Sequence, residues 1–196
     1  IRDKLVTGVQ TCALPISFIK PVIDAGAPGI VVPQVTSVAE VQGVIDDCRS
    51  PPMGCRGFGP LVASDYGRMG DAYVDRANGS LFVSVMIECV EAVDVIDEIV
   101  ALPGLDSIVL GPYDLSGSLG LLGQVHHPDV VAAMERVIAA AKAQNVPVGS
   151  GMPIDTEFAL LQASRGVQWM QMGGDIGYMM GAVDDAVRAV RSRLPQ

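Results

Sequence analysis

Two apolar, β-branched runs in the middle of the chain each lead to a carboxylate. The run VSVMIE ends at Glu88, and the run SIVLGPYD ends at Asp114. Residues 89–113 are long enough for one crossover helix and a second strand, so the two strands should run parallel with both acids at one edge of a sheet. Two oxygen ligands there are typical of a hard divalent cation that keeps open positions for a chelating substrate. From the residues alone, the acids could equally bond loop amides or cap helices.

The first residues of the chain do not share the pattern of the rest. Residues 1–16 show no sustained helical or strand period, and VTGVQTCALPI looks like the translation of a sequencing-library adapter. We therefore predict a non-native leader at 1–16, with the native domain at 17–196 having once extended further upstream. A secretory signal is the competing interpretation. Four residues interrupt the apolar core that such a signal needs: Thr7, Gln10, Thr11 and Pro15.

Composition excludes several classes of partner. A net charge of −9 and a pI near 4.5, without a Lys/Arg run, argue against nucleic acid. The mean hydropathy is high at +0.39, yet no apolar run approaches the roughly 18 residues that span a membrane. The four cysteines form neither a Cys-x-x-Cys pair nor a His/Cys cluster, which indicates reduced thiols and predicts a cytoplasmic protein.

Strand and helix patterns alternate along the remaining sequence. Each expected strand is followed by a helix or by a loop and a helix. A long Gly- and Pro-containing connection over residues 51–80 suggests a substrate-covering loop. The five expected strands cover residues 28–34, 81–88, 106–111, 145–151 and 167–174.

Continuous apolar strands that alternate with helices indicate an α/β protein with a parallel sheet covered by helices. A doubly wound open sheet should carry a G-x-G-x-x-G turn after its first strand, and the sequence has none. A (β/α)8 TIM barrel usually takes about 250 residues. We therefore predict an incomplete barrel of about five C-terminal β/α units that lacks roughly the first three strands.

Several motifs together resemble one family. IKPVIDAGAPGIVVPQV, PPMGCRGFGP, VMIE and LGPYDLSGSLG followed by HP are similar in order and spacing to the HpcH/HpaI aldolases, over residues 18–196. These are class II, metal-dependent pyruvate aldolases. The resemblance implies a (β/α)8 barrel, a homo-oligomer, and a Mg²⁺, Mn²⁺ or Co²⁺ cofactor. It also implies reversible cleavage of a 4-hydroxy-2-oxo acid into pyruvate and an aldehyde.

The resemblance assigns roles to particular residues. Glu88 and Asp114 match the metal ligands, and the substrate would chelate the cation so that the metal stabilises an enolate. No Schiff-base lysine is then required, and Lys20 and Lys142, the only lysines after the leader, fall on expected helices facing away. The backbone at Tyr113 and Asp114 would hold the substrate carboxylate. Without the resemblance, this segment would simply be a turn.

Two further positions follow from the same resemblance. Asp24 matches an Asp that reaches a neighbouring subunit and raises the basicity of the catalytic His, although its position alone indicates a solvated acid in a last helical turn. Met86 is expected in the substrate site, where the best-known members have a Gln. A thioether has no hydrogen-bond donor, so that contact is either lost or made elsewhere.

The family's His base and oxyanion-stabilising Arg belong to the early strands that we expect to be absent, so this chain is predicted to be inactive by itself. His126 and His127 match a helix-entry segment, which predicts a capping or surface role. Arg56 and Arg68 in the long connection could approach a substrate carboxylate or bond loop carbonyls. Two other functions remain open: a citrate-lyase-like acyl-CoA lyase, which the acidic balance disfavours, and a non-catalytic barrel fragment.

Overall fold

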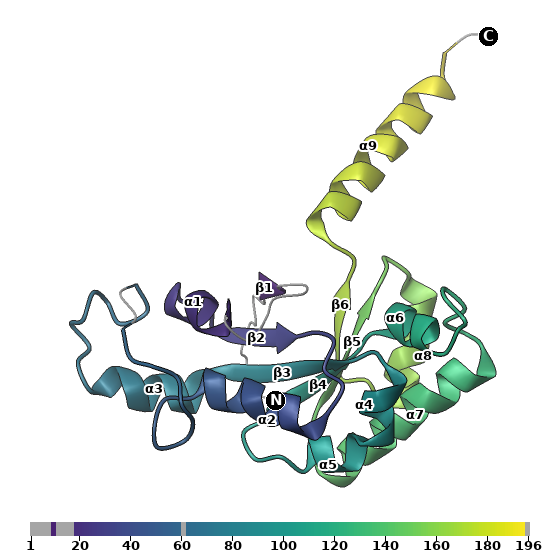
Figure 1. The fold of residues 1–196 in the computed structure, drawn as a ribbon. Coiled ribbons are helices and arrows are strands. Elements are labelled where there is room, and N and C mark those ends of the chain that lie inside the picture. The colour runs from purple at the N-terminus through teal and green to yellow at the C-terminus, as the bar shows by residue number, and fades with distance from the viewer. Residues whose placement is uncertain (1–8, 11–17, 60–61, 195–196) are drawn as a thin grey trace.

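A single parallel sheet runs through the protein. The computed structural model describes residues 9–10, 18–59 and 62–194. Each strand of the sheet lies beside the next one in the chain, and every pairing is parallel (Figure 1). The strands are β1 (Val9–Gln10), β2 (Gly29–Val32), β3 (Phe82–Ile87), β4 (Ser107–Leu110), β5 (Val148–Met152) and β6 (Trp169–Met172).

This strand order decides between the two architectures. A doubly wound sheet reverses its strand order at a switch point, whereas the order here is strictly sequential, as in a barrel. Strands β2, β3, β4 and β6 fall within their expected runs, and β5 extends one residue beyond its run, to Met152. The α/β class and the part-barrel arrangement are therefore confirmed, while the number of β/α units in the full protein stays a prediction.

Strand β1 lies inside the predicted leader. Val9 and Gln10 pair with Ile30 and Val31 of β2. The rest of the leader, residues 1–8 and 11–16, lies outside the described residues. The non-native origin of residues 1–16 therefore remains a prediction.

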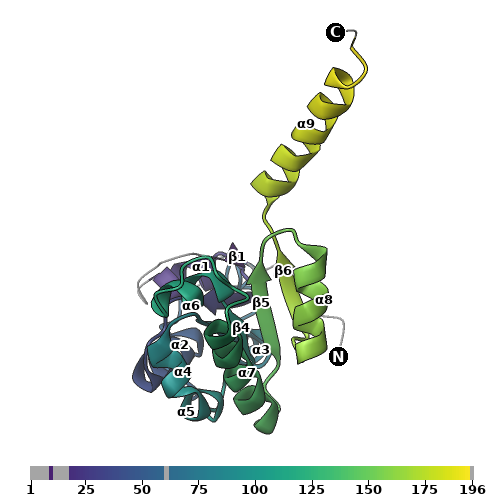
Figure 2. The same cartoon turned by 90° about the vertical axis from the view of Figure 1, so that its right-hand side faces the viewer.

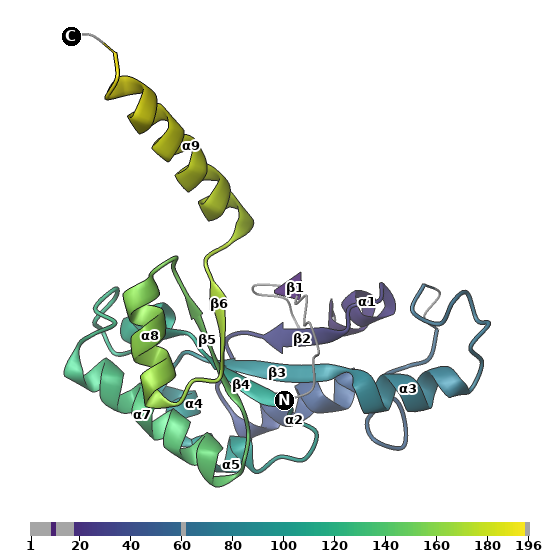
Figure 3. The same cartoon turned by 180° about the vertical axis from the view of Figure 1, so that it is seen from behind.

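Helices follow the strands and cover the sheet. Helices α2, α4, α5 and α7 lie along one face of it, and α8 lies beside β5 and β6 (Figures 1 and 3). The sequence prediction missed α3 within the long connection and treated α4 and α5 as one helix. The bounds are α1 (Ile19–Asp24), α2 (Val38–Cys48), α3 (Ala72–Ser80), α4 (Val90–Asp94), α5 (Ile96–Val100), α6 (Pro112–Ser118), α7 (Pro128–Ala143), α8 (Thr156–Arg165) and α9 (Asp175–Arg191).

The core explains why the central strands read as unbroken apolar runs. Every residue of β4 is buried, as are five of the six in β3, because the sheet is enclosed on both faces. The buried hydroxyls within it are paired: Ser84 Oγ donates to the Ser107 carbonyl at 2.9 Å, and Trp169 Nε1 donates to Ser107 Oγ at 2.9 Å. The buried polar groups of the sheet thus avoid the cost of desolvation without a partner.

A buried arginine ties the two ends of the long connection together. Arg49 is 5% exposed, and its guanidinium donates to the Asn78 carbonyl at 2.6 Å and to Asp106 at 3.1 Å. Asp106 also accepts the Val83 N–H at 2.8 Å, which anchors the start of β3. The connection lies at the opposite side of the molecule from α6 and α8 (Figure 1). None of its described residues lines the pocket identified below, so the expected covering role is not seen.

The last helix projects away from the body of the molecule, as two perpendicular views show (Figures 1 and 2). Every residue of α9 is exposed, including an apolar stripe formed by Ile176, Met179, Met180, Val183, Val187 and Val190. In a β/α repeat the helix after a strand ordinarily packs back onto the sheet. Among the described residues, no helix is both long and apolar enough to cross a membrane.

Candidate functional site at the C-terminal edge of the sheet

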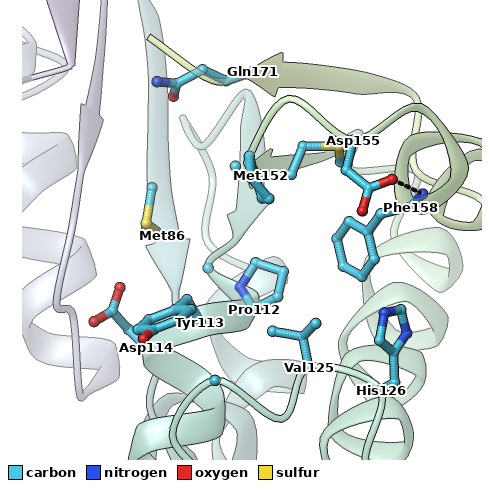
Figure 4. A pocket seen from close by; sticks show the side chains of 14 residues that line it. Met86, Pro112, Tyr113, Asp114, Val125, His126, Met152, Asp155, Phe158 and Gln171 are labelled. Atoms are coloured by element: carbon cyan, nitrogen blue, oxygen red, sulfur yellow. Dashed lines mark hydrogen bonds between the residues drawn. The ribbon is translucent and has the colours of Figure 1, made fainter. Parts of the chain in front are cut away.

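A pocket of about 560 Å³ opens where strands β3 to β6 end. Met86 of β3, residues 111–114 after β4 and Gln171 of β6 line it, together with residues beyond β5 and in the loop before α7 (Figure 4). Parallel strands deliver their following loops to one edge, which is where α/β proteins bind their ligands. The pocket therefore forms at the edge that the sequence predicted.

The two predicted metal ligands lie at this edge. Glu88 directly follows β3 and is buried, at 6% exposed, and Asp114 lies exposed in the first turn of α6. Glu88 Oε1 accepts the backbone N–H of Gln34 at 2.7 Å. Burial raises the pKa of Glu88, the Gln34 N–H opposes that shift, and the negative charge of Asp114 raises the pKa further. The two carboxylates are thus close enough to interact.

Gly111 brings the chain unusually close to Glu88. A Cβ placed on Gly111 would lie 2.7 Å from both Cβ and Oε2 of Glu88 and 3.2 Å from the Met86 sulfur. Only glycine permits this approach without displacing a neighbour. Glu88 itself does not line the pocket, but it lies close to Gly111, which does.

Tyr113 and Asp114 open helix α6 beside the pocket. Pro112 occupies the first turn of α6, where its missing N–H costs nothing, and no side chain caps the helix. The first backbone amides of a helix lack intrahelical partners. The Tyr113 ring packs near Gly123 across the pocket wall and is 59% exposed. Substrate binding by these amides stays a prediction.

Met86 lines the same pocket, and its role in substrate binding stays a prediction. Its side chain is 6% exposed and lines the pocket, with the sulfur against Gly111 (Figure 4). A thioether offers no hydrogen-bond donor, so the pocket wall at Met86 is apolar.

Asp24 lies apart from the acid pair. It ends α1, forms an ion pair with Lys20, and its Oδ1 stands 3.9 Å from Arg56 Nη1. Asp24 Oδ1 and Arg56 Nη1 are both buried without a hydrogen bond. Asp24 does not line the pocket, so a catalytic role would require a neighbouring subunit and remains a prediction.

The two arginines left open by the sequence do not contact the pocket. Arg56 is buried, and its guanidinium donates to the Tyr73 hydroxyl at 3.2 Å and lies over that ring. Arg68 is exposed and pairs with Asp65 at 3.1 Å. Both therefore serve the structure of the long connection.

His126 and His127 occupy different positions in the structure. His127 is the N-cap of α7, and its Nδ1 accepts the Asp129 N–H at 3.3 Å, as a capping role requires. His126 instead lines the pocket, with its ring edge-on to Phe158 at 5.4 Å between centroids (Figure 4). Sequence reasoning had grouped them and missed the pocket position of His126.

Sequence reasoning also missed the pocket wall beyond β5. Met152, Asp155, Phe158 and Gln171 line the pocket without having been singled out. The available signal was positional, because these residues lie at the end of β5, after β5 or near the end of β6, and those strands deliver their loops to the same edge as Glu88.

Comparison with known proteins agrees with this geometry. The sequence profile described as HpcH/HpaI aldolase/citrate lyase matches residues 7–182. A hydroxypyruvate/pyruvate aldolase of Paraburkholderia phytofirmans is 33% identical over 180 residues, which cover 89% of this chain and 68% of that protein. A 2-dehydro-3,6-dideoxy-6-sulfogluconate aldolase of Pseudomonas putida is 32% identical, over 90% of this chain and 69% of its own.

A solved structure shows the same arrangement of elements. The HpcH/HpaI aldolase from Desulfitobacterium hafniense superimposes with a TM-score of 0.86 at 31% identity, covering 96% of this chain and 73% of that one. The match in sequence extends across the strands, the acid pair and the pocket. The chain therefore belongs to the HpcH/HpaI aldolase/citrate lyase family.

Proposed function

We propose that this chain carries the metal and substrate site of an aldolase that cleaves 4-hydroxy-2-oxo acids into pyruvate and an aldehyde. The observation that carries the proposal is the pair Glu88 and Asp114, held beside one pocket at the C-terminal edge of the sheet. The two curated relatives compared above are named as aldolases, one of hydroxypyruvate and pyruvate. Their activities support the reaction class.

The donor set fits a divalent cation. Glu88 and Asp114 offer carboxylate oxygens, and the raised pKa of Glu88 reflects a partly buried negative pair that a cation would relieve. Within the described chain, no group of three or more His, Cys, Asp or Glu side chains is placed to hold a metal. The two carboxylates of Glu88 and Asp114 would hold Mg²⁺, Mn²⁺ or Co²⁺ and leave positions open to water and substrate. When bound, the cation supplies charge stabilisation for the enolate.

Residues of this chain would position the Glu88 carboxylate and the 2-oxo acid substrate. The Gln34 N–H holds the Glu88 carboxylate in one position, and Gly111 lets the chain pass close to it. The amides at Tyr113 and Asp114 would seat the carboxylate of a 2-oxo acid, with the apolar Met86 wall beside it. Among the described residues that line the pocket there is no lysine, which disfavours a Schiff-base route.

We propose that the proton-moving His and the oxyanion-stabilising Arg lie outside this chain's pocket, so that the chain by itself has little turnover. His126 lines the pocket on the wall opposite Asp114, with Pro112 and Val125 between them (Figure 4). That position does not suit a base acting beside the acid pair. Measurable aldol cleavage by the purified chain, abolished by Glu88→Gln, would contradict this proposal.

We further propose a homo-oligomeric, cytoplasmic full-length protein. The exposed apolar stripe of α9 supports assembly, because a helix face of this kind is stable when another surface covers it. A second copy of the chain is the occupant that we propose. Cys48, Cys55 and Cys89 are free thiols, which suits a reducing compartment.

Calorimetric titration of Mn²⁺ with and without pyruvate tests the proposed site. We expect Mn²⁺ uptake that pyruvate strengthens, and a loss of at least tenfold in affinity for Glu88→Gln and Asp114→Asn. Glu98→Gln and Asp94→Asn are matched controls, because they remove exposed acids outside the pocket. Wild-type protein that takes up no Mn²⁺ in the presence of pyruvate would overturn the proposal.

A further inference from the structure

The pocket has a second half that pyruvate bound at the acid pair would leave empty. Pyruvate has only six non-hydrogen atoms, and the pocket measures about 560 Å³. Asp114 lies on one wall, whereas His126 and Phe158 lie on the other (Figure 4). We propose, resting on the proposed function, that this second half receives the aldehyde-derived part of the substrate and that Asp155 restricts that part to uncharged groups.

The far wall is mainly apolar and well packed. Met152 and Phe158 are 8% and 5% exposed and belong to a small apolar cluster to which Val125 also packs. These side chains project into the pocket beyond Pro112 (Figure 4). A short alkyl or hydroxyalkyl chain would bury its carbons against this wall at a gain of roughly 0.8 kcal/mol per CH₂.

The second half also carries a fixed negative charge. Asp155 is the N-cap of α8, and its Oδ1 accepts the Phe158 N–H at 3.0 Å, which holds the carboxylate at the pocket wall. No ion pair engages Asp155 within the described ranges. The dashed line in Figure 4 marks the capping bond. Because the bond defines its position, this carboxylate cannot readily turn away from a bound ligand.

No cationic Lys or Arg side chain on the described walls offsets that charge. The titratable side chains that line the pocket are Asp114, Asp155, His126 and the Tyr113 phenol, and none of the described lining residues is Lys or Arg. A second carboxylate, sulfonate or phosphate on the substrate would therefore meet repulsion from Asp155, with no Lys or Arg side chain among the described lining residues to pair with it. An uncharged substrate tail would not meet this repulsion.

Polar but neutral groups would still be accommodated. The His126 ring is held edge-on against Phe158, and in the described part of the chain no hydrogen bond or ion pair occupies its nitrogens. The Gln171 amide also lines the pocket. These groups can exchange hydrogen bonds with a hydroxyl, so the aldehydes that fit are uncharged, either alkyl or hydroxylated.

Equilibrium binding of unreactive 2-oxo acids tests the inference at pH 8, above the range in which histidines ordinarily titrate. Pyruvate, 2-oxopentanoate and 2-oxoglutarate share the chelating head, and the last two differ at the end that would enter the second half. They lack a 4-hydroxyl and cannot undergo aldol cleavage, so the chain's turnover does not matter. Their affinities are measured by calorimetry in the presence of Mn²⁺.

We expect 2-oxopentanoate to bind at least as tightly as pyruvate, and 2-oxoglutarate to bind about tenfold more weakly than 2-oxopentanoate. Asp155→Asn keeps the side-chain oxygen that caps α8 but removes the charge. It should narrow the tenfold gap in affinity between 2-oxopentanoate and 2-oxoglutarate to about threefold or less. Glu157→Gln removes an exposed charge two residues away, outside the pocket, and should leave the gap intact.

The outcomes separate the two proposals. Pyruvate binding with no preference between the longer acids, or a gap that Asp155→Asn leaves unchanged, would overturn the inference and leave the proposed function standing. If Glu157→Gln narrowed the difference in affinity between 2-oxopentanoate and 2-oxoglutarate equally, the cause would be the general negative potential of this surface. That result would also overturn the role of Asp155. Absence of Mn²⁺-dependent pyruvate binding would overturn the proposed function, and the inference with it.

Discussion

The backbone N–H of Gln34 donates to Glu88 Oε1 at 2.7 Å, joining two residues 54 positions apart in the chain. Gln34 adopts a positive φ of 57°, a left-handed conformation that non-glycine residues seldom take. Such a conformation persists where the surrounding structure determines it, and it is frequent at functional sites. The loop after β2 thus helps to hold the acid that follows β3.

The stability of the metal-free protein should depend on pH through Glu88. Burial raises the pKa of its carboxyl and the charge of Asp114 adds to the shift, so the folded protein holds this proton more tightly than the unfolded chain. The resulting stabilisation is complete below the ordinary range of a glutamate and is lost as the pH rises through the folded pKa. In EDTA at pH 7.5, Glu88→Gln should therefore unfold at a higher urea concentration than wild type.

At pH 4 the difference between the two proteins should shrink, because Glu88 is then largely protonated in both states. Gln retains an oxygen for the Gln34 N–H, so the comparison isolates the charge. Equal urea midpoints at pH 7.5 would contradict the prediction.

Replacing Gly111 should damage the acid pair. The Cβ of Gly111→Ala would lie 2.7 Å from Glu88 Cβ and Oε2, so Glu88 or the backbone must move. We expect a loss of about 1–3 kcal/mol in the free energy of unfolding. Mn²⁺ affinity, measured by calorimetry, should fall as well.

Gly79→Ala is the matched control, because a Cβ at that position in α3 would meet nothing within 4 Å. We expect it to be neutral or stabilising by up to about 1 kcal/mol. If Gly111→Ala bound Mn²⁺ as Gly79→Ala does, the close approach would have no role in the site.

Removal of Arg49 should strongly destabilise the fold. Arg49→Ala would leave the buried Asn78 carbonyl without its 2.6 Å donor and Asp106 without its ion pair. We expect a loss of about 2–4 kcal/mol, measured by urea denaturation. Arg68→Ala, which breaks an exposed pair with Asp65, should cost no more than about 0.5 kcal/mol. Similar costs for the two variants would refute the assigned anchoring role.

The apolar stripe of α9 should control self-association. Val183→Glu places a charge within the stripe, and Gly181→Glu places one outside the stripe, where a Cβ would meet no neighbour. Sedimentation velocity should show that Val183→Glu reduces association and Gly181→Glu does not. An unchanged distribution for both variants would indicate that α9 does not form the contact.

The sequence alone determined strands β2 to β6 and the edge at which the acids that follow them lie. Unbroken apolar runs locate buried parallel strands, and parallel strands must deliver their following residues to one edge, so Glu88 and Asp114 could be placed from pattern and spacing. Met86 was singled out only through the family resemblance. Tertiary structure decided which other residues share that edge. The approach of Gly111 to Glu88, the position of His126 and Asp155 on the far wall, and the separation of Asp24 from the pocket all depend on how loops cross above the sheet. A local pattern specifies which face a side chain takes, whereas contacts between distant loops arise only from the curvature and packing of the whole sheet.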